Sequence, residues 1–506
     1  MHLTSRLSPR MWGGREWGWI GPIGVAVLAL VLRVWNVAQP RLVMFDETYY
    51  AKDAWSLLQN GYVQDFTDQA NDKIVDGDLT NLMTGDPSWV VHPEGGRLMI
   101  AIGEHFFGLD PFGWRIAAVV IGSLTVLLLA RLVRRLTGST IVGCFAGLLL
   151  AVDGAHFVLS RIALLDVFLA FWILAAVACL VADHDRAVAR ERIRGWFRPW
   201  QLAAGVCFGM ACATKWSGVY SLAAFGLLVV GWEVMARRDR WTAVLRTGIP
   251  AFASIVVVAG AVYLLTWTGW LIHHDVYEAR FGYGYGTYSE PWGAYLDRNP
   301  SGFLGETRDA LRSLWHFHVM TFEFHTQGLD TATHPYQSNP IGWLMLDRPV
   351  GVDAQNDLPA ASCGASADSS CIRVVTILGN PAVWWAGAIA TLASIVAWFR
   401  TRDGRWAVPV VGVLSGWLPW FLNDDRPIFS FYAITVLPFM IIAIAMLADL
   451  AYRSASTIRG RYIVLVLSGA LAVTAIGLLC YFYPILTDEL VPYDTWYSRM
   501  WTSRWI

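Results

Sequence analysis

The stretch GWIGPIGVAVLALVLRVWNV, residues 18–37, contains one ionisable side chain, Arg33. An α-helix needs about 20 consecutive apolar residues to cross the hydrocarbon core of a bilayer. The stretch therefore predicts a membrane-spanning helix, and Arg33 lies near its outer end. The acidic pair Asp46-Glu47 follows a few residues later. The sequence thus sets two carboxylates close to the point where the chain leaves the lipid.

The whole chain of 506 residues repeats this apolar character. It is 56% hydrophobic and 15% charged, with a mean hydropathy of +0.44. Soluble domains are about 45–50% apolar, so we predict an all-α polytopic membrane protein, residues 1–506, without a separate soluble domain. The 27 Trp residues fit the membrane–water interface. The net charge of -1 indicates no nucleic-acid partner. About 11 predicted spans lie near 18–37, 112–130, 139–157, 164–182, 200–214, 218–235, 248–270, 379–399, 406–422, 428–450 and 462–483.

Arginines in the short loops predict the orientation of the chain. Cytoplasmic loops carry an excess of Lys and Arg. With these spans, one side collects clusters that include Arg6, Arg10, Arg15, Arg131, Arg134, Arg135, Arg400, Arg402, Arg405, Arg453, Arg459 and Arg461. The N-terminus is therefore expected in the cytoplasm, and an odd number of spans puts the C-terminus outside.

Two long polar segments, residues 38–96 and 271–378, then face outward. Loops of this length are often functional. The apolar stretch Arg97–Gly108 is too short to span and predicts a half-buried helix along the interface. Cys363 and Cys371 leave two interpretations open. They form a disulfide if the second loop meets an oxidising compartment, or they remain two free thiols.

Asp46 and Glu47 are the first candidates for chemistry. Adjacent side chains diverge by about 100° on a helix and point to opposite faces of a strand, so the two acids do not share one proton. One acts as a base while the other orients a ligand, or both are solvated loop charges. The flanking Phe45 and Tyr49 favour the functional interpretation, because they bracket the pair with interfacial aromatics.

Cations gather at the predicted outer ends of several spans: Arg115, Arg161, Lys215 and Arg426, with Asp166 beside Arg161. An ionisable group at a membrane boundary is costly unless it is paired or reaches the interface. Either each one snorkels, or the set holds a phosphate headgroup, for which Arg offers a bidentate fork. The histidines, His92 among them, lack a His-Glu-x-x-His spacing, so no metal site is predicted. No nucleotide-binding loop or serine-hydrolase elbow occurs either.

Taken together, these stretches resemble the protein O-mannosyltransferases, membrane glycosyltransferases of the GT-C class that use a lipid-phosphate-linked mannose. The matching motifs are Phe45-Asp-Glu47, Val91-His-Pro-Glu-Gly-Gly-Arg97, Ser160-Arg-Ile-Ala-Leu-Leu-Asp166, Thr214-Lys-Trp-Ser-Gly218, Asn339 to Pro349 and Arg426-Pro-Ile-Phe-Ser-Phe-Tyr432. Two features depart from the family. Glu94 and Arg97 stand where it often has Pro and Lys, and residues 271–378 look too short for the MIR domain of eukaryotic members. The resemblance is therefore to the bacterial branch.

The resemblance implies transfer of mannose from polyprenyl-phosphate-mannose, the co-substrate, to Ser/Thr hydroxyls of secreted or membrane proteins, on the outer face of the cell membrane and with inversion. Asp46 would be the general base and Glu47 its supporting acid, although exchanged roles stay open. Arg115, Arg426 and Lys215 would contact the donor phosphate. Asp166, Arg161, His92 and Arg97 would support the site. An unfolded acceptor emerging from the protein export channel would be the easiest to reach, which makes the channel a candidate partner.

Two rival functions remain. A GT-C enzyme that glycosylates a lipid or a cell-wall polysaccharide would share the acidic loop and the cations. A secondary transporter would show broken helices, ionisable residues at the bilayer midplane and repeated halves. Most ionisable residues here lie near span ends instead, with Arg33 as the exception.

Overall fold

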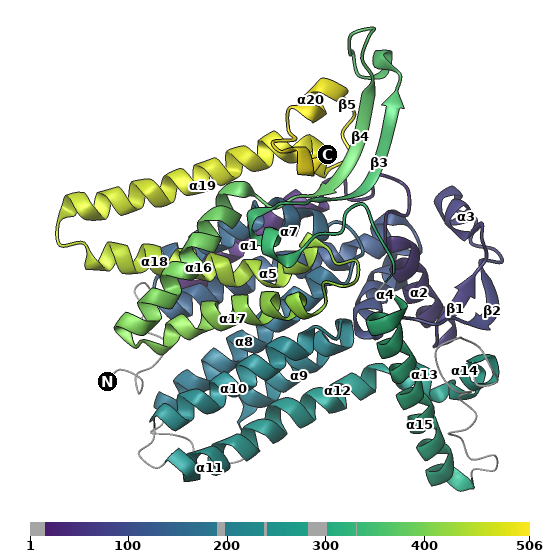
Figure 1. Cartoon of the computed structure of the whole chain (residues 1–506), viewed down its shortest axis with the longest axis horizontal. Helices are drawn as coiled ribbons and strands as arrows, with labels where there is room; N and C mark the ends of the chain where they lie inside the picture. The colour runs from purple at the N-terminus through teal and green to yellow at the C-terminus, as the bar shows by residue number, and fades with distance from the viewer. Residues whose placement is uncertain (1–15, 190–197, 237–239, 282–300, 330) are drawn as a thin grey trace.

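Figure 1 shows the computed structural model, which describes residues 16–189, 198–236, 240–281, 301–329 and 331–506. The N-terminal arginines that enter the orientation prediction lie outside these residues. Long helices run side by side through the body of the molecule, and the polar connections gather at one end of them (Figure 1).

Every predicted span coincides with a helix or with consecutive helices. These are α1 (Trp17–Val34), α5 (Pro111–Thr137), α6 (Thr140–Ala151), α7 (Gly154–Leu159), α8 (Asp166–Ala189), α9 (Pro199–Thr214), α10 (Gly218–Ala236), α11 (Arg240–Phe252), α12 (Val258–Thr266), α16 (Pro381–Thr401), α17 (Ala407–Trp417), α18 (Leu437–Ser454) and α19 (Ile458–Leu486). Within the described residues, six helical segments are long and apolar enough to cross a membrane by length and composition: α5, α8, α11–α12, α16, α18 and α19. The chain is a helical, multi-pass membrane protein.

The two long loops are structured. The first holds α2 (Glu47–Asn60), β1 (Gln64–Phe66), α3 (Ala70–Asp76) and β2 (Met83–Pro87), and α4 (Gly95–Phe107) begins where it ends. The second begins at the end of α13 (Thr268–Ile272) and holds α14 (His274–Phe281), α15 (Gly302–Glu323), β3 (Val350–Leu358) and β4 (Cys371–Ile377). Near the C-terminus lie β5 (Val491–Pro492) and α20 (Tyr493–Tyr497). The predicted interfacial stretch Arg97–Gly108 is largely α4, with one face buried and Leu98, Ile102 and Phe106 exposed.

Two small antiparallel sheets, β1–β2 and β3–β4–β5, depart from the all-α prediction. Their strands are short, and β2 is polar, so the sequence carries little of the alternation that marks a strand. The β3–β4 hairpin projects away from the helices (Figure 1). Cys363 and Cys371 form a disulfide there, with an S–S distance of 2.08 Å.

The core forms around α5 and α8. Both faces of α8 are buried, with Val167, Phe168 and Leu174 enclosed. Small residues let its neighbours approach closely, as is common in membrane helix packing. A Cβ at Gly143 of α6 would lie 2.4 Å from the carbonyl oxygen of Ala130 in α5. A larger residue at this position would force the two helices apart.

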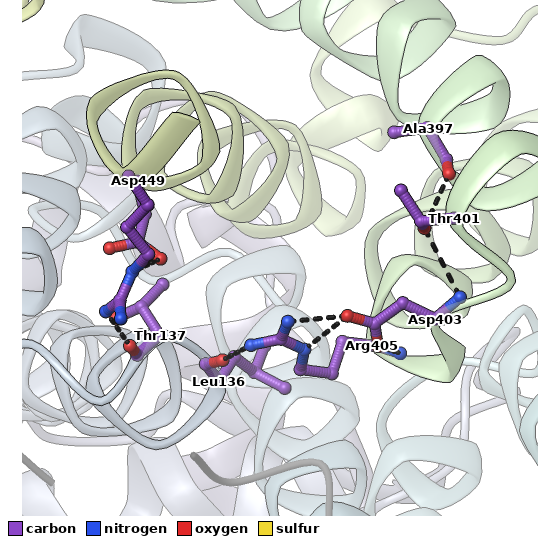
Figure 2. A network of polar contacts seen from close by, with 8 residues as sticks. Leu136, Thr137, Ala397, Thr401, Asp403, Arg405 and Asp449 are labelled. Carbon is purple, nitrogen blue, oxygen red and sulfur yellow. Dashed lines mark hydrogen bonds and ion pairs between the residues drawn. The ribbon is translucent and has the colours of Figure 1, made fainter. Parts of the chain in front are cut away.

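Two arginines donate hydrogen bonds to the last carbonyls of α5, at the end of the helix that lies opposite the long loops. The last carbonyls of a helix lack intrahelical partners and carry partial negative charge. Arg405 donates to the carbonyl of Leu136 (2.9 Å), and Arg453 donates to that of Thr137 (2.6 Å). Figure 2 shows this network, in which Asp403 and Asp449 hold the two guanidinium groups in place. Arginines of the predicted cytoplasmic side thus have a structural use.

Candidate active site

A cavity of about 570 Å³ opens among the loops and the ends of the spans. Its walls come from α2, the extended segment 88–92, the start of α8, the turn before α10, the end of α15 and residues 415–435. Of the predicted site residues, it brings together Asp46, His92, Arg97, Asp166, Lys215 and Arg426. Glu47, Arg115 and Arg161 lie outside its walls.

Asp46 reaches the cavity because of the turn that precedes α2. Phe45 has a positive φ of 47°, uncommon for a residue with a side chain, and its ring packs edge-on against Phe429 and Phe431. Such a conformation persists where the surroundings hold it. One face of α2 then presents Asp46, Tyr50 and Asp53 to the cavity, at the i, i+4, i+7 spacing of a helix.

The groups around Asp46 shift the pKa of its carboxyl. Tyr50, one helical turn further on, also lines the cavity and lowers the pKa of Asp46. Burial raises the pKa of Asp46 to about 6, while Lys215 lowers it and Asp166 raises it further. A carboxylate with a pKa nearer to the working pH is a better general base than an ordinary one.

Glu47 points away from the cavity into the protein. It is fully buried and accepts hydrogen bonds from Nε and Nη2 of Arg115 (2.9 and 2.8 Å) and from the backbone N–H groups of Met44 (3.0 Å) and Ala163 (2.9 Å). The predicted divergence of the two acids is therefore present.

Arg115 is enclosed together with Glu47. Its remaining N–H groups donate to backbone carbonyls between α1 and α2, which belong to Val37, Pro40 and Leu42. We call Glu47 and Arg115 the buried clamp. The clamp joins the start of α5 to the loop that carries Asp46 and to the turn before α8.

Lys215 and Arg426 are the cations that border the cavity together with Arg97. Lys215 Nζ contacts both carboxylate oxygens of Asp166 (3.0 and 2.8 Å) and lies 4.9 Å from the centre of the Tyr432 ring. Arg426 Nη1 lies 3.1 Å from His325 Nδ1. Its buried Nε meets no hydrogen-bond partner among the described residues. An unpartnered guanidinium N–H beside a cavity fits an anionic ligand.

His325 is the clearest residue that the sequence analysis missed. It lies in a π-helical turn, Phe324–Gly328, and such turns are frequent at functional sites. Burial lowers the pKa of His325, so its Nε2 donates to the Val91 carbonyl (2.9 Å) while Nδ1 accepts from Arg426. His92 stacks on it at 5.5 Å, and burial lowers the pKa of His92 well below its usual value. The chain holds many loop histidines, and no local pattern distinguishes this one.

Two predicted supporting residues have structural contacts. Arg97 pairs with Asp53 (3.3 Å) and donates to the His92 carbonyl, which fixes one wall of the cavity. Arg161 donates to the carbonyls of Arg33 (2.8 Å) and Trp35 (2.6 Å) at the end of α1. No group of three or more His, Cys, Asp or Glu side chains suited to a metal ion occurs within the described residues.

The amino-acid sequence matches two protein-family models and is similar to several bacterial proteins. Residues 23–276 match the family model described as dolichyl-phosphate-mannose-protein mannosyltransferase, and residues 310–505 match the C-terminal four TMM region of protein-O-mannosyltransferase. A polyprenol-phosphate-mannose–protein mannosyltransferase of Mycobacterium tuberculosis is 34% identical, over 96% of this chain and 92% of the relative. The Mycolicibacterium smegmatis relative of that name is also 34% identical, over 97% and 93%.

Solved structures share the fold. The Saccharomyces cerevisiae protein O-mannosyltransferase Pmt1–Pmt2 complex bound to the sugar donor matches with a TM-score of 0.72 and 15% identity, over 100% of this chain and 94% of that one. An oligosaccharyltransferase of Archaeoglobus fulgidus in its apo form gives 0.53 at 14% identity, over 97% and 58%. With its near full-length bacterial relatives and two matching family models, the chain belongs to the protein O-mannosyltransferase family and is a glycosyltransferase.

Proposed function

We propose that the chain transfers mannose from polyprenyl-phosphate-mannose to Ser or Thr hydroxyls of secreted or membrane proteins, with Asp46 as the general base. The observation that carries this proposal is one cavity that holds a half-buried carboxylate with a raised pKa together with cations suited to a phosphate. The names of the mycobacterial relatives supply the donor and the class of acceptor.

The chemistry follows from the charges of the cavity. Asp46 takes the proton from the acceptor hydroxyl as that oxygen attacks the anomeric carbon. The leaving group is a lipid phosphate, and Arg426 and Lys215 stabilise its charge as the bond to the sugar breaks. The guanidinium group of Arg426, which lines the cavity, is the donor that we assign to a phosphate oxygen. A single in-line displacement of this kind inverts the anomeric centre.

The other predicted site residues take supporting roles in this proposal. Asp166 holds Lys215 in place through its ion pair. The buried clamp positions Asp46, so Glu47 and Arg115 act through the loop and touch neither donor nor acceptor. His92, Arg97 and His325 shape the wall next to Arg426, and Arg161 holds the end of α1 against the turn before α8.

The proposal includes an orientation. With about 11 spans and a cytoplasmic N-terminus, the cavity and the C-terminus face the outside of the cell membrane. Nucleotide sugars are not available there, so an activated sugar must arrive on a lipid. Acceptors that leave the export channel unfolded would present their hydroxyls most readily.

The test uses membranes that contain the wild-type chain, Asp46→Asn or the matched control Asp72→Asn. Asp72 is an exposed acid of α3 in the same loop, and it does not line the cavity. Each sample receives labelled polyprenyl-phosphate-mannose and a Ser/Thr-rich peptide. Wild type and Asp72→Asn should transfer label, and Asp46→Asn should be at least about 100-fold slower. Equal rates in all three would remove Asp46 from the chemistry. Label that enters only a lipid or polysaccharide fraction would favour the rival transferase.

A further inference from the structure

Helix α15 has two faces of different character. The inward face carries Leu314, Phe317 and Met320, which pack into a buried cluster with Trp267 and Trp270. The outward face carries a row of large apolar side chains: Leu304, Leu311, Trp315 and Phe322, of which Leu304 is 82% and Trp315 73% exposed. Spacings of seven and four residues keep this row on one stripe of the helix. We call these four residues the outer stripe.

The direction of α15 differs from that of the spans. In Figure 1 the helix runs across the end of α12 instead of alongside it. It packs against α13, which follows α12 after a single residue. Exposed apolar residues continue along this path, with Leu264 and Leu265 at the end of α12 and Ile272 in α13. Exposed apolar side chains are therefore also found on α12 and α13, the elements next to α15.

Basic residues beside the outer stripe also favour a position at the membrane surface. Arg308 and Arg312 are exposed, and the helical spacing puts them on one flank of the outer stripe. Arg308 also contacts Asp309 (3.1 Å). Basic side chains flanking an apolar stripe are typical of helices that lie in the plane of a bilayer, where they meet lipid phosphates. A Trp within the stripe fits the same region.

We infer that α15 is a membrane-interface helix, which inserts the outer stripe among the lipid chains of the leaflet on which the cavity opens. Its C-terminal end runs directly into the π-helical turn Phe324–Gly328, and Phe322, Phe324 and His325 line the cavity. The helix therefore holds one edge of the cavity at the level of the lipid headgroups. This role goes beyond the transfer reaction itself.

The first experiment measures depth in the bilayer. Trp315→Cys and the matched control Glu306→Cys are made in a Cys480→Ser background, because Cys480 is an exposed free thiol. Glu306 is exposed and lies on the opposite side of the helix. Each variant is labelled with a fluorophore in phosphatidylcholine vesicles, and the unlabelled background is subtracted. Doxyl-lipid should quench the label on the Trp315→Cys variant and leave that on Glu306→Cys unaffected, whereas aqueous iodide should do the reverse.

Two outcomes overturn the inference. Quenching of the Trp315→Cys label by iodide alone would place the stripe in water. Protection of that label from both quenchers, together with disulfide cross-linking of two Trp315→Cys chains through the introduced thiol, would assign the stripe to a second copy.

The second experiment rests on the proposed function. Trp315→Glu should lower kcat/KM for the lipid-linked donor about tenfold in vesicles, and Trp315→Tyr should restore it, because Glu is excluded from the interface region that Tyr favours. In detergent solution all three chains should perform alike. A defect of the same size in detergent would indicate a structural role only. If the wild type transfers no mannose, the proposed function fails while the quenching result still decides the position of α15.

Discussion

Two ion pairs of similar geometry border the loop that carries Asp46. Glu47 and Arg115 lie 2.8 Å apart, and so do Asp166 and Lys215. The first pair is fully enclosed, and protein groups take up its hydrogen bonds. The second borders the cavity, so a ligand can reach Lys215. A cation at the end of a span is therefore a candidate ligand contact only where a ligand can approach it through the cavity.

The largest effect is expected from breaking the buried pair. Glu47→Gln would leave Arg115 as a buried charge without a counterion, at a cost of about 3–5 kcal/mol. Thermal unfolding in detergent should show a much less stable chain. Asp166→Asn is the comparison, because water in the cavity can solvate Lys215, and its loss of stability should be clearly smaller. Equal stability of the two variants would remove the distinction between the pairs.

Arg426 provides the next test. Arg426→Ala should weaken binding of polyprenyl phosphate about tenfold to a hundredfold, since a hydrogen bond to a charged group contributes about 1.5–3 kcal/mol. The fold should persist, because the guanidinium borders the cavity. Arg115→Lys should show the opposite pattern, with reduced stability and unchanged affinity in the fraction that folds. Titration with the phosphate lipid checks both, and full affinity of Arg426→Ala would contradict the assignment.

Lowering the pH should slow mannose transfer, because it protonates Asp46. Burial raises the pKa of this carboxyl to about 6, and only the ionised form accepts a proton. Below that pH the base becomes protonated, so kcat/KM should fall about tenfold per pH unit and level off above about pH 7. A pH profile of peptide mannosylation measures this limb. The residual activity of the Asp46→Asn variant should not fall at low pH in this way. If it does fall, the titrating group is not Asp46.

The smallest effect is expected at the far end of the spans. Arg405→Gln removes a donor to the Leu136 carbonyl, for which about 0.5–1.5 kcal/mol of stability is expected. Transfer should be unchanged at temperatures where the chain is folded. A change in donor KM would show that this end communicates with the cavity.

The apolar runs and short motifs predicted much of this architecture, because span length and charge at the membrane boundary are local properties of a sequence. Local sequence also singled out an acid and cations that the structure brings to one cavity: Asp46, Lys215 and Arg426. It could not tell that Arg115 turns toward Glu47, since that contact joins residues 68 positions apart. His325 was missed for a related reason, because a π-helical turn and the distant Arg426 decide its position.

The residues that line the cavity are synthesised far apart in time. Its walls draw on residues from Asp46 to Thr435, and Arg426 comes close to the end of that range. During synthesis, the acid is made hundreds of residues before the cation that we assign to the phosphate. A ribosome-bound chain that has inserted only its N-terminal half therefore lacks a complete site. The cavity is complete only once the chain has been made as far as the segment 415–435, which supplies its last wall.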